Sequence, residues 1–194
     1  ETLKESQNPL RMSSSNDMLL IQTFAMTGDL DNAGKYAQTL IHKSVLNILS
    51  CSALMLSVQL SNKEWCNETI RRIDQLIESF YFEEVNKNVV IQYFYQAAVA
   101  KVLYEEKEEA YHYLNKFVEQ GIDLVKHPEQ IFTFEQYFKR MEEWTTECAL
   151  SSILPRDKSF IVSDLLAMLE HPVLQCLSGE AAFERLKKKI QEEM

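Results

Sequence analysis

Cysteine and histidine are the residues of this sequence that could hold a metal ion or form a nucleophile–base pair. The sequence has four of each: Cys51, Cys66, Cys148 and Cys176, and His42, His112, His127 and His171. No two cysteines form a CxxC pair, and no histidine lies at a ligand spacing from them. We therefore predict neither a zinc site nor a disulfide framework, and we expect reduced thiols in a cytoplasmic protein.

The other motifs that could carry chemistry have simpler explanations. The acidic run 105–109 lacks the alternating ligands and the glycine of a calcium loop. The glycosylation sequon at 67–69 would not be used in a cytoplasmic chain. The lysines 187–189 fall near the end of a predicted helix, where its dipole favours cations. Since no acid, base and nucleophile come together in a recognisable pattern, we expect no enzyme, no cofactor and no metal.

Composition predicts the elements that must position any binding residues. The chain has 194 residues, 46% of them hydrophobic, with only four glycines and four prolines. Helix-favouring Leu, Glu, Lys, Gln and Ala are plentiful, and no strand-like alternation bounded by turn residues appears. We predict an all-α fold.

Charge and hydropathy limit the partners. The formal net charge is -9, which argues against direct contact with nucleic acid, because such binding depends on clustered Lys and Arg. No apolar run of about eighteen residues suggests a membrane helix, and the N-terminus lacks a signal-peptide core. The sequence begins at Glu1 without an initiator methionine, so we expect a part of a longer protein.

Apolar periodicity predicts about nine helices joined by short connectors. We take residues 1–15 as a flexible N-terminal segment or linker and 16–194 as one helical domain, with repeats over about 16–120 and capping helices over about 121–194. The expected helices are 16–27, 31–43, 45–61, 63–80, 86–104, 107–120, 128–150, 156–170 and 179–192. The tetrapeptide at 61–64 fits a capping box, and Gly121 follows the last periodic residue of its helix.

The segment "GDLDNAGKYAQTLI", which begins at Gly28, matches "EEKEEAYHYLNKFV", which begins at Glu105. At this offset of 77 residues Ala33 aligns with Ala110. A third copy, at an offset of 33, has its turn near Asn62 and aligns Cys66 with Ala33. A helix pair, a period near 34 and a small residue early in the second helix indicate a repeated unit.

The turn at Gly28–Ala33 resembles that of the tetratricopeptide repeat, which implies a right-handed α-solenoid of antiparallel helix pairs with a concave groove. The tail, with a proline-initiated helix, an "HPVL" turn and a final "FERL" helix, is similar to the C-terminal end of tetratricopeptide-like regions in bacterial helix-turn-helix repressor-type regulators. In that family such domains bind short peptides or mediate dimer contacts.

The first helix of each tetratricopeptide pair lines the groove. That register predicts groove contacts by Gln22, Met26, Ser52, Gln59, Gln92 and Tyr95. Polar amides and a tyrosine suit an extended peptide, whose backbone groups need hydrogen-bond partners. The alternative is that the aromatic run at 93–95 packs in the core.

The resemblance implies a peptide-sensing and dimerisation domain of a bacterial transcriptional regulator, whose DNA-binding helix-turn-helix lies upstream. The alternative is a free-standing adaptor that joins protein partners. About sixty to seventy upstream residues with a basic recognition helix would favour the regulator. In either case the expected partners are a peptide or protein in the groove and possibly a second copy, with no direct nucleic-acid contact and no membrane.

Overall fold

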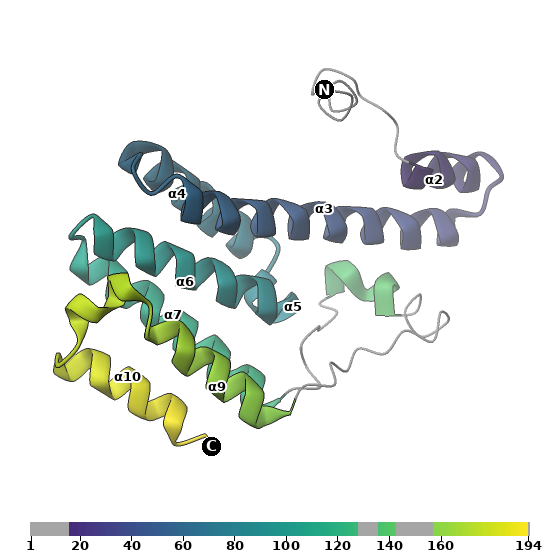
Figure 1. The fold of residues 1–194 in the computed structure, drawn as a ribbon. Helices are drawn as coiled ribbons and strands as arrows, with labels where there is room; N and C mark the ends of the chain where they lie inside the picture. Colours follow the sequence, from purple (N-terminus) through teal and green to yellow (C-terminus); the bar gives the residue numbers. More distant parts are fainter. Residues whose placement is uncertain (1–15, 128–135, 143–156, 194) are drawn as a thin grey trace, which may run out of the picture.

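The protein is all-helical in the parts described by the computed structural model, which are residues 16–127, 136–142 and 157–193 (Figure 1). The elements are α2 (Asn16–Met26), α3 (Leu30–Val58), α4 (Lys63–Ser79), α5 (Phe82–Val85), α6 (Lys87–Leu103), α7 (Lys107–Lys126), η2 (Gln136–Phe138), α9 (Lys158–Leu169), η3 (Pro172–Leu177) and α10 (Ala181–Gln191). The all-α prediction is confirmed. The predicted segment 1–15 and most of the predicted helix 128–150 lie outside the described residues.

Helix α3 corrects the predicted helices 31–43 and 45–61, which form one continuous helix of 29 residues. Nothing between Ile41 and Val45 stops a helix, because the stretch has no glycine or proline. The Ser44 hydroxyl donates to the Leu40 carbonyl at 2.8 Å and so stays within the helix. The first two predicted repeats therefore share a helix.

The length of α3 also corrects the expectation that no helix could cross a membrane. An 18-residue window in α3 has a mean hydropathy of 1.4, with 28% of it buried. One such helix is weak evidence for a membrane protein, because core helices of soluble proteins pass the same test. Leu49 and Leu56 of α3 are fully buried against the rest of the protein.

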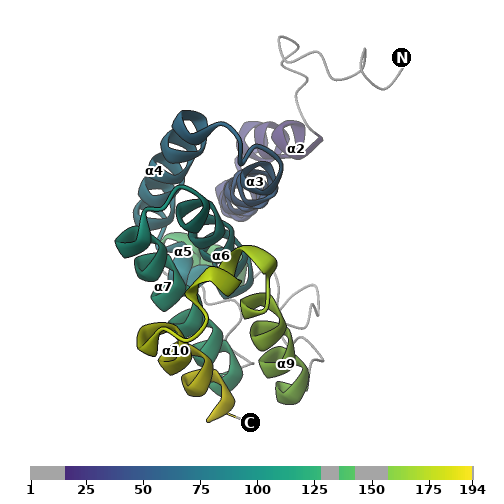
Figure 2. The same cartoon turned by 60° about the vertical axis from the view of Figure 1, so that its left-hand side comes forward.

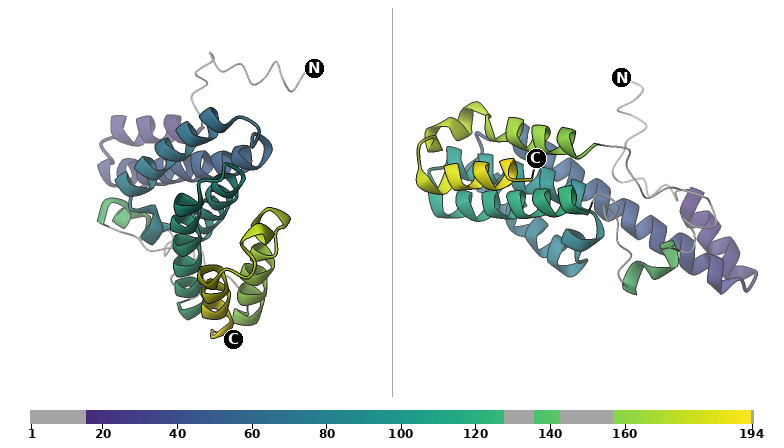
Figure 3. Two further views of the ribbon diagram at one scale, coloured as in Figure 1. Left: turned by 90° about the vertical axis from the view of Figure 1, so that its left-hand side faces the viewer. Right: turned by 90° about the horizontal axis from the view of Figure 1, so that it is seen from below.

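The helices are arranged around α6, which lies at the centre (Figure 2). Elements α3, α4, α5, α7 and η3 all contact it, so side chains on most of its surface are buried. A helix that is apolar on all sides belongs in such a position. Helices α9 and α10 pack on α7, and α2 lies on the N-terminal half of α3, away from α9 and α10 (Figure 3).

The three predicted turns do begin new helices. Asp29 and Asn62 cap α3 and α4 by accepting hydrogen bonds from the backbone of Asn32 and Trp65. The aligned small residues are all buried, with Ala33 8% exposed and Cys66 and Ala110 0%. These three aligned residues therefore all lie on the buried sides of their helices.

Gly121 does not end its helix, as the sequence suggested. Helix α7 continues to Lys126, and a Cβ on Gly121 would lie 2.8 Å from a methyl carbon of Leu165 in α9. The glycine therefore allows α9 to approach closely. The helix ends before His127, which precedes Pro128 in the sequence, and proline disfavours a helical residue before it.

A buried ion cluster fixes the start of α7 against α6 and α4. The Lys101 ammonium donates to Glu106 at 2.7 Å and to Asn67 at 2.9 Å, and it also pairs with Glu109. Burial alone would lower the pKa of Lys101, but the hydrogen bonds to Glu106 and Glu109 outweigh burial and raise it. The charge is thus compensated inside the fold.

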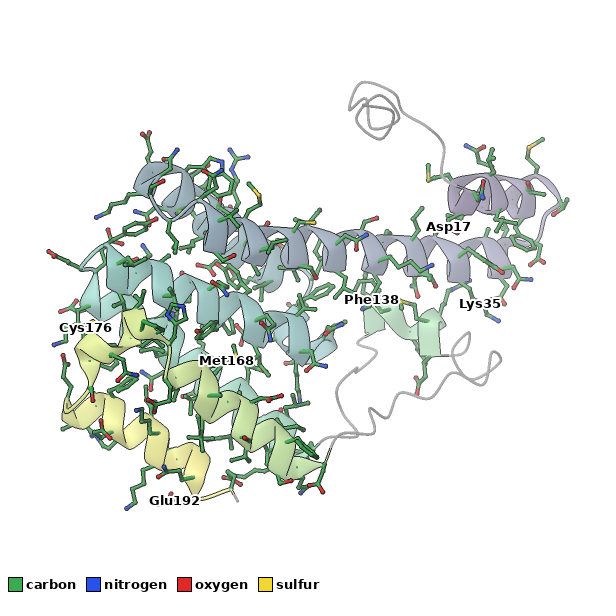
Figure 4. The ribbon with its side chains drawn as sticks, viewed as in Figure 1. Asp17, Lys35, Phe138, Met168, Cys176 and Glu192 are labelled. Atoms are coloured by element: carbon green, nitrogen blue, oxygen red, sulfur yellow. The ribbon has the colours of Figure 1, made fainter. Side chains whose placement is uncertain are left out.

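The segment 136–142 packs on α3, on the side opposite to α2 (Figure 4). Phe138 is fully buried, and its ring centroid lies 5.5 Å from that of His42 in α3. Arg140 holds the same segment to the start of α3 through Asp31 at 3.2 Å. Phe138 and Met141, three residues apart in this segment, are both buried.

Candidate functional site

An apolar hollow of about 400 Å³ lies between α3 and α4, and we call it the α3/α4 groove. Residues from α3 and α4 line it: Ile48, Cys51, Ser52, Met55, Trp65, Thr69, Arg72, Ile73 and Leu76. The α3 residues follow helical spacings of three and four, as do the α4 residues Trp65, Thr69, Arg72 and Leu76, so each set forms a stripe beside the core. Ile48, Met55 and Trp65 remain 49%, 38% and 38% exposed, so apolar surface is available to a ligand.

Arg72 is the charged residue among those that line the α3/α4 groove, and it belongs to an ion cluster on α4. Arg71 and Arg72 both donate to Glu68, at 2.8 Å each. The hydrogen bonds from Arg71 and then Arg72 lower the pKa of Glu68 to about 2, so this carboxylate stays ionised. Two guanidinium groups thus share one carboxylate. An apolar group that carries a carboxylate would match this groove.

The predicted groove residues do not come together in one site. Ser52 lines the α3/α4 groove. Gln22 and Met26 lie exposed on α2, Gln59 is exposed at the C-terminal cap of α3, and Gln92 is exposed on α6.

Tyr95 is a correction, because it does not project beside Gln92 into open space. It is 7% exposed, and its ring centroid lies 5.7 Å from that of Phe117 and 6.1 Å from that of His171. Burial raises the pKa of its hydroxyl. Phe94 is buried as expected, at 1% exposure. Tyr95 therefore belongs to the packing layer, as the alternative interpretation had it.

A second hollow, of about 420 Å³, lies among α4, α5, α6 and α7 and is lined largely by charged residues. Asp74 at its base accepts hydrogen bonds from Tyr93 at 2.8 Å and Tyr113 at 2.6 Å. Burial and then Asp74 raise the pKa of both tyrosines. Lys116 pairs with Glu83 at 2.7 Å. These polar groups satisfy one another and tie three helices together, which is a structural role.

Sequence reasoning missed the most informative residues of the α3/α4 groove, Trp65 and Arg72. Their spacing could have indicated them, since seven residues separate them on one side of α4. Among the described residues, no group of three or more His, Cys, Asp or Glu side chains could hold a metal ion. The α3/α4 groove offers apolar side chains and one guanidinium group for contact with a ligand.

Comparison with known proteins gives no guide to the ligand: no family model, no curated protein and no solved structure matches this chain.

Proposed function

We propose that this chain is the peptide-sensing and dimerisation domain of a bacterial, cytoplasmic transcriptional regulator, whose DNA-binding part lies upstream. The observation that carries the proposal is the α3/α4 groove, which combines exposed apolar side chains with Arg72 on its rim. The ligand is a short peptide that places an apolar side chain near Trp65 and a carboxylate near Arg72. The role of the α3/α4 groove is binding and not catalysis.

A tetratricopeptide-like arrangement of helix pairs is part of this proposal. Support comes from the turns at Gly28 and Glu105, which are 77 residues apart and have φ values of 80° and 61°. Further support comes from the buried residues Ala33, Cys66 and Ala110 at equivalent positions in three helices. The shared helix α3 makes the first two units more tightly coupled than separate pairs would be.

Peptide titration tests the groove directly. Trp65 lines the groove, so its fluorescence should change when apolar peptides with a free C-terminal carboxylate bind. The substitution Arg72→Gln should weaken binding about tenfold, which corresponds to about 1.4 kcal/mol.

Arg71→Gln is the matched control, because Arg71 also pairs with Glu68 but does not line the groove. It should leave the affinity unchanged. Equal losses from both arginine substitutions, or no binding by any peptide of a randomised library, would contradict the groove proposal.

The second candidate is a free-standing adaptor, which the same groove would serve. The regulator and the adaptor differ in what the gene encodes upstream of Glu1. The regulator requires an upstream segment of about sixty to seventy residues with a basic recognition helix, which is enough for a helix-turn-helix module. Reading the complete gene distinguishes them, and a start codon immediately before Glu1 would favour the adaptor.

A further inference from the structure

Helix α2 is rich in apolar residues, yet none of its residues is buried. It contacts α3 along one side, where the rings of Phe24 and Tyr36 stack with centroids 5.4 Å apart. Helix α6 is also rich in apolar residues, but five elements contact it: α3, α4, α5, α7 and η3. A helix of this composition is normally covered by several neighbours. Among the described elements, α3 is the one on which α2 packs substantially, and most α2 residues stay exposed.

The outward side of α2 forms a continuous stripe. Residues 19, 22, 23 and 26 share one face by their spacing of three, four and seven. Leu19 is 50% exposed and Met26 is 88% exposed on this face, which lies away from Phe24 and the contact with α3. Leu20 adds apolar surface at the side, at 41% exposure. This stripe, and not the peptide groove, contains the predicted residues Gln22 and Met26.

The α2–α3 hairpin is poor in charge. Residues 16–60 contain two lysines and three aspartates, a formal net charge of 2 − 3 = −1, against −9 for the whole chain. Asp17 pairs with Lys43 at 3.9 Å, and Asp31 pairs with Lys35 at 3.1 Å and with Arg140. A basic partner would be drawn to the acidic remainder of the molecule. A second acidic copy, in contrast, can approach without repulsion only where charge is scarce.

We propose that two copies of this chain associate through their α2–α3 hairpins and form an intermolecular four-helix bundle with the outer faces of α2 inside. The proposal rests on the self-association part of the proposed function and names the surface responsible. In such a dimer the hairpin of the second copy supplies the neighbours that α2 lacks in a single copy. The four helices then share one core, as in a four-helix bundle.

The size of the hairpin face sets the expected strength. At 1.5 Å per residue and about 10 Å per helix, the face spanned by α2 and the first turns of α3 measures roughly 20 by 20 Å, or about 400 Å² in footprint. Stable interfaces bury about 800 Å² of accessible surface per partner. The association should therefore be reversible and depend on concentration in the micromolar range.

Sedimentation velocity of the complete chain over a concentration series tests the proposal. The parent should pass from 22.6 kDa toward twice that mass, 2 × 22.6 = 45.2 kDa. The double variant Leu19→Gln with Met26→Gln should dissociate at least tenfold more readily. The control double variant Leu103→Gln with Phe160→Gln removes apolar side chains of 44% and 66% exposure elsewhere and should behave as the parent.

Disulfide capture provides a second readout that does not depend on weakening the surface. The background replaces Cys51, Cys148 and Cys176 with serine. Gln22→Cys, at the middle of the α2 stripe, should give a covalent dimer on mild oxidation, whereas Ser163→Cys on exposed α9 should not.

Two results would overturn the proposal directly: a parent that stays monomeric at all concentrations, or a dimer that the α2 double variant does not weaken. A monomeric parent that co-sediments with phosphatidylcholine vesicles would also overturn it and would assign the α2 stripe to a membrane surface. Peptide titration of the same samples separates the two proposals, because the groove lies between α3 and α4. Intact peptide binding by a monomeric parent would remove only the dimer surface.

Discussion

At the scale of the residue, Glu105 has a backbone conformation that favours glycine, in the turn before α7. Its φ is 61°, in the left-handed region, where the equivalent position in the first turn has Gly28 with a φ of 80°. A side chain in this region costs about 1–2 kcal/mol, because Cβ approaches the following carbonyl oxygen. The sequence alignment placed a glutamate opposite a glycine, and the backbone kept the glycine conformation.

Glu105→Gly should therefore stabilise the protein by up to about 1 kcal/mol, after the added flexibility of glycine in the unfolded chain is subtracted. Chemical denaturation measures the free energy of unfolding. Glu108→Gly is the control, since Glu108 is exposed within α7 and the change should destabilise the protein by about 1 kcal/mol. A Glu105→Gly variant that is no more stable than the parent would show that the turn is not strained.

His42 gives the fold a predictable dependence on pH. It is 8% exposed and stacks on Phe82 with centroids 5.6 Å apart, and burial lowers its pKa from 6.5. The unfolded chain therefore takes up a proton on His42 at a higher pH than the folded chain. The stability that this neutral histidine supports is complete above about pH 6.5 and decreases as the pH falls toward the lower folded pKa.

His42→Phe should remove this part of the acid sensitivity, because a phenyl ring fills the site without a titrating group. Denaturation at pH 7.5 and at pH 5.5, or at any pair of values on the two sides of the unfolded pKa near 6.5, gives the change in unfolding free energy. His127→Gln is the control at an exposed position and should titrate as the parent. An equal decrease in parent and His42→Phe would assign the effect to other groups.

At the scale of the element, the continuity of α3 is the main difference between expectation and structure. A predicted connector near Ser44 would tolerate proline, whereas the middle of a helix would not. Proline removes a backbone donor and clashes with the carbonyl four residues earlier, which here belongs to Leu40. The helix also links the α2 stripe to the α3/α4 groove.

Ser44→Pro should destabilise the protein by about 3 kcal/mol or more, as measured by thermal or chemical unfolding. Ser44→Ala is the matched control and should be neutral or slightly stabilising, since alanine favours helices and Ser44 is exposed. If proline at this position were tolerated, the chain would have two helices there, as the sequence pattern alone suggested.

At the scale of the whole molecule, negative charge and apolar surface are separated. The hairpin of residues 16–60 carries a net charge of −1 out of −9. Nine of the fourteen large hydrophobic side chains found exposed in the described parts lie between Met18 and Val58. Surface of this kind favours association through apolar contacts, and the acidic remainder disfavours nucleic acid.

The isolated chain should consequently show no measurable binding to duplex DNA at physiological salt, because its formal net charge is -9 and such binding depends on neutralising phosphates with many cations. Fluorescence anisotropy of a labelled duplex measures this. A micromolar association that weakens with added salt would contradict the expectation and would indicate a basic surface that net charge does not reveal.

The sequence by itself determined the class of fold, most helix positions and the buried faces at Ala33, Cys66 and Ala110, because these depend on local periodicity and on turn residues. It did not determine that α3 is continuous. The residues around Ser44 are compatible with a helix and with a connector, and tertiary packing decides between the two. It also misplaced Tyr95, because the exposure of this side chain depends on how many neighbours surround α6, and five elements leave little open surface beyond Gln92. The α3/α4 groove, with Trp65 and Arg72, exists only where two helices diverge in space. That divergence is set by long-range contacts, which a local pattern does not contain.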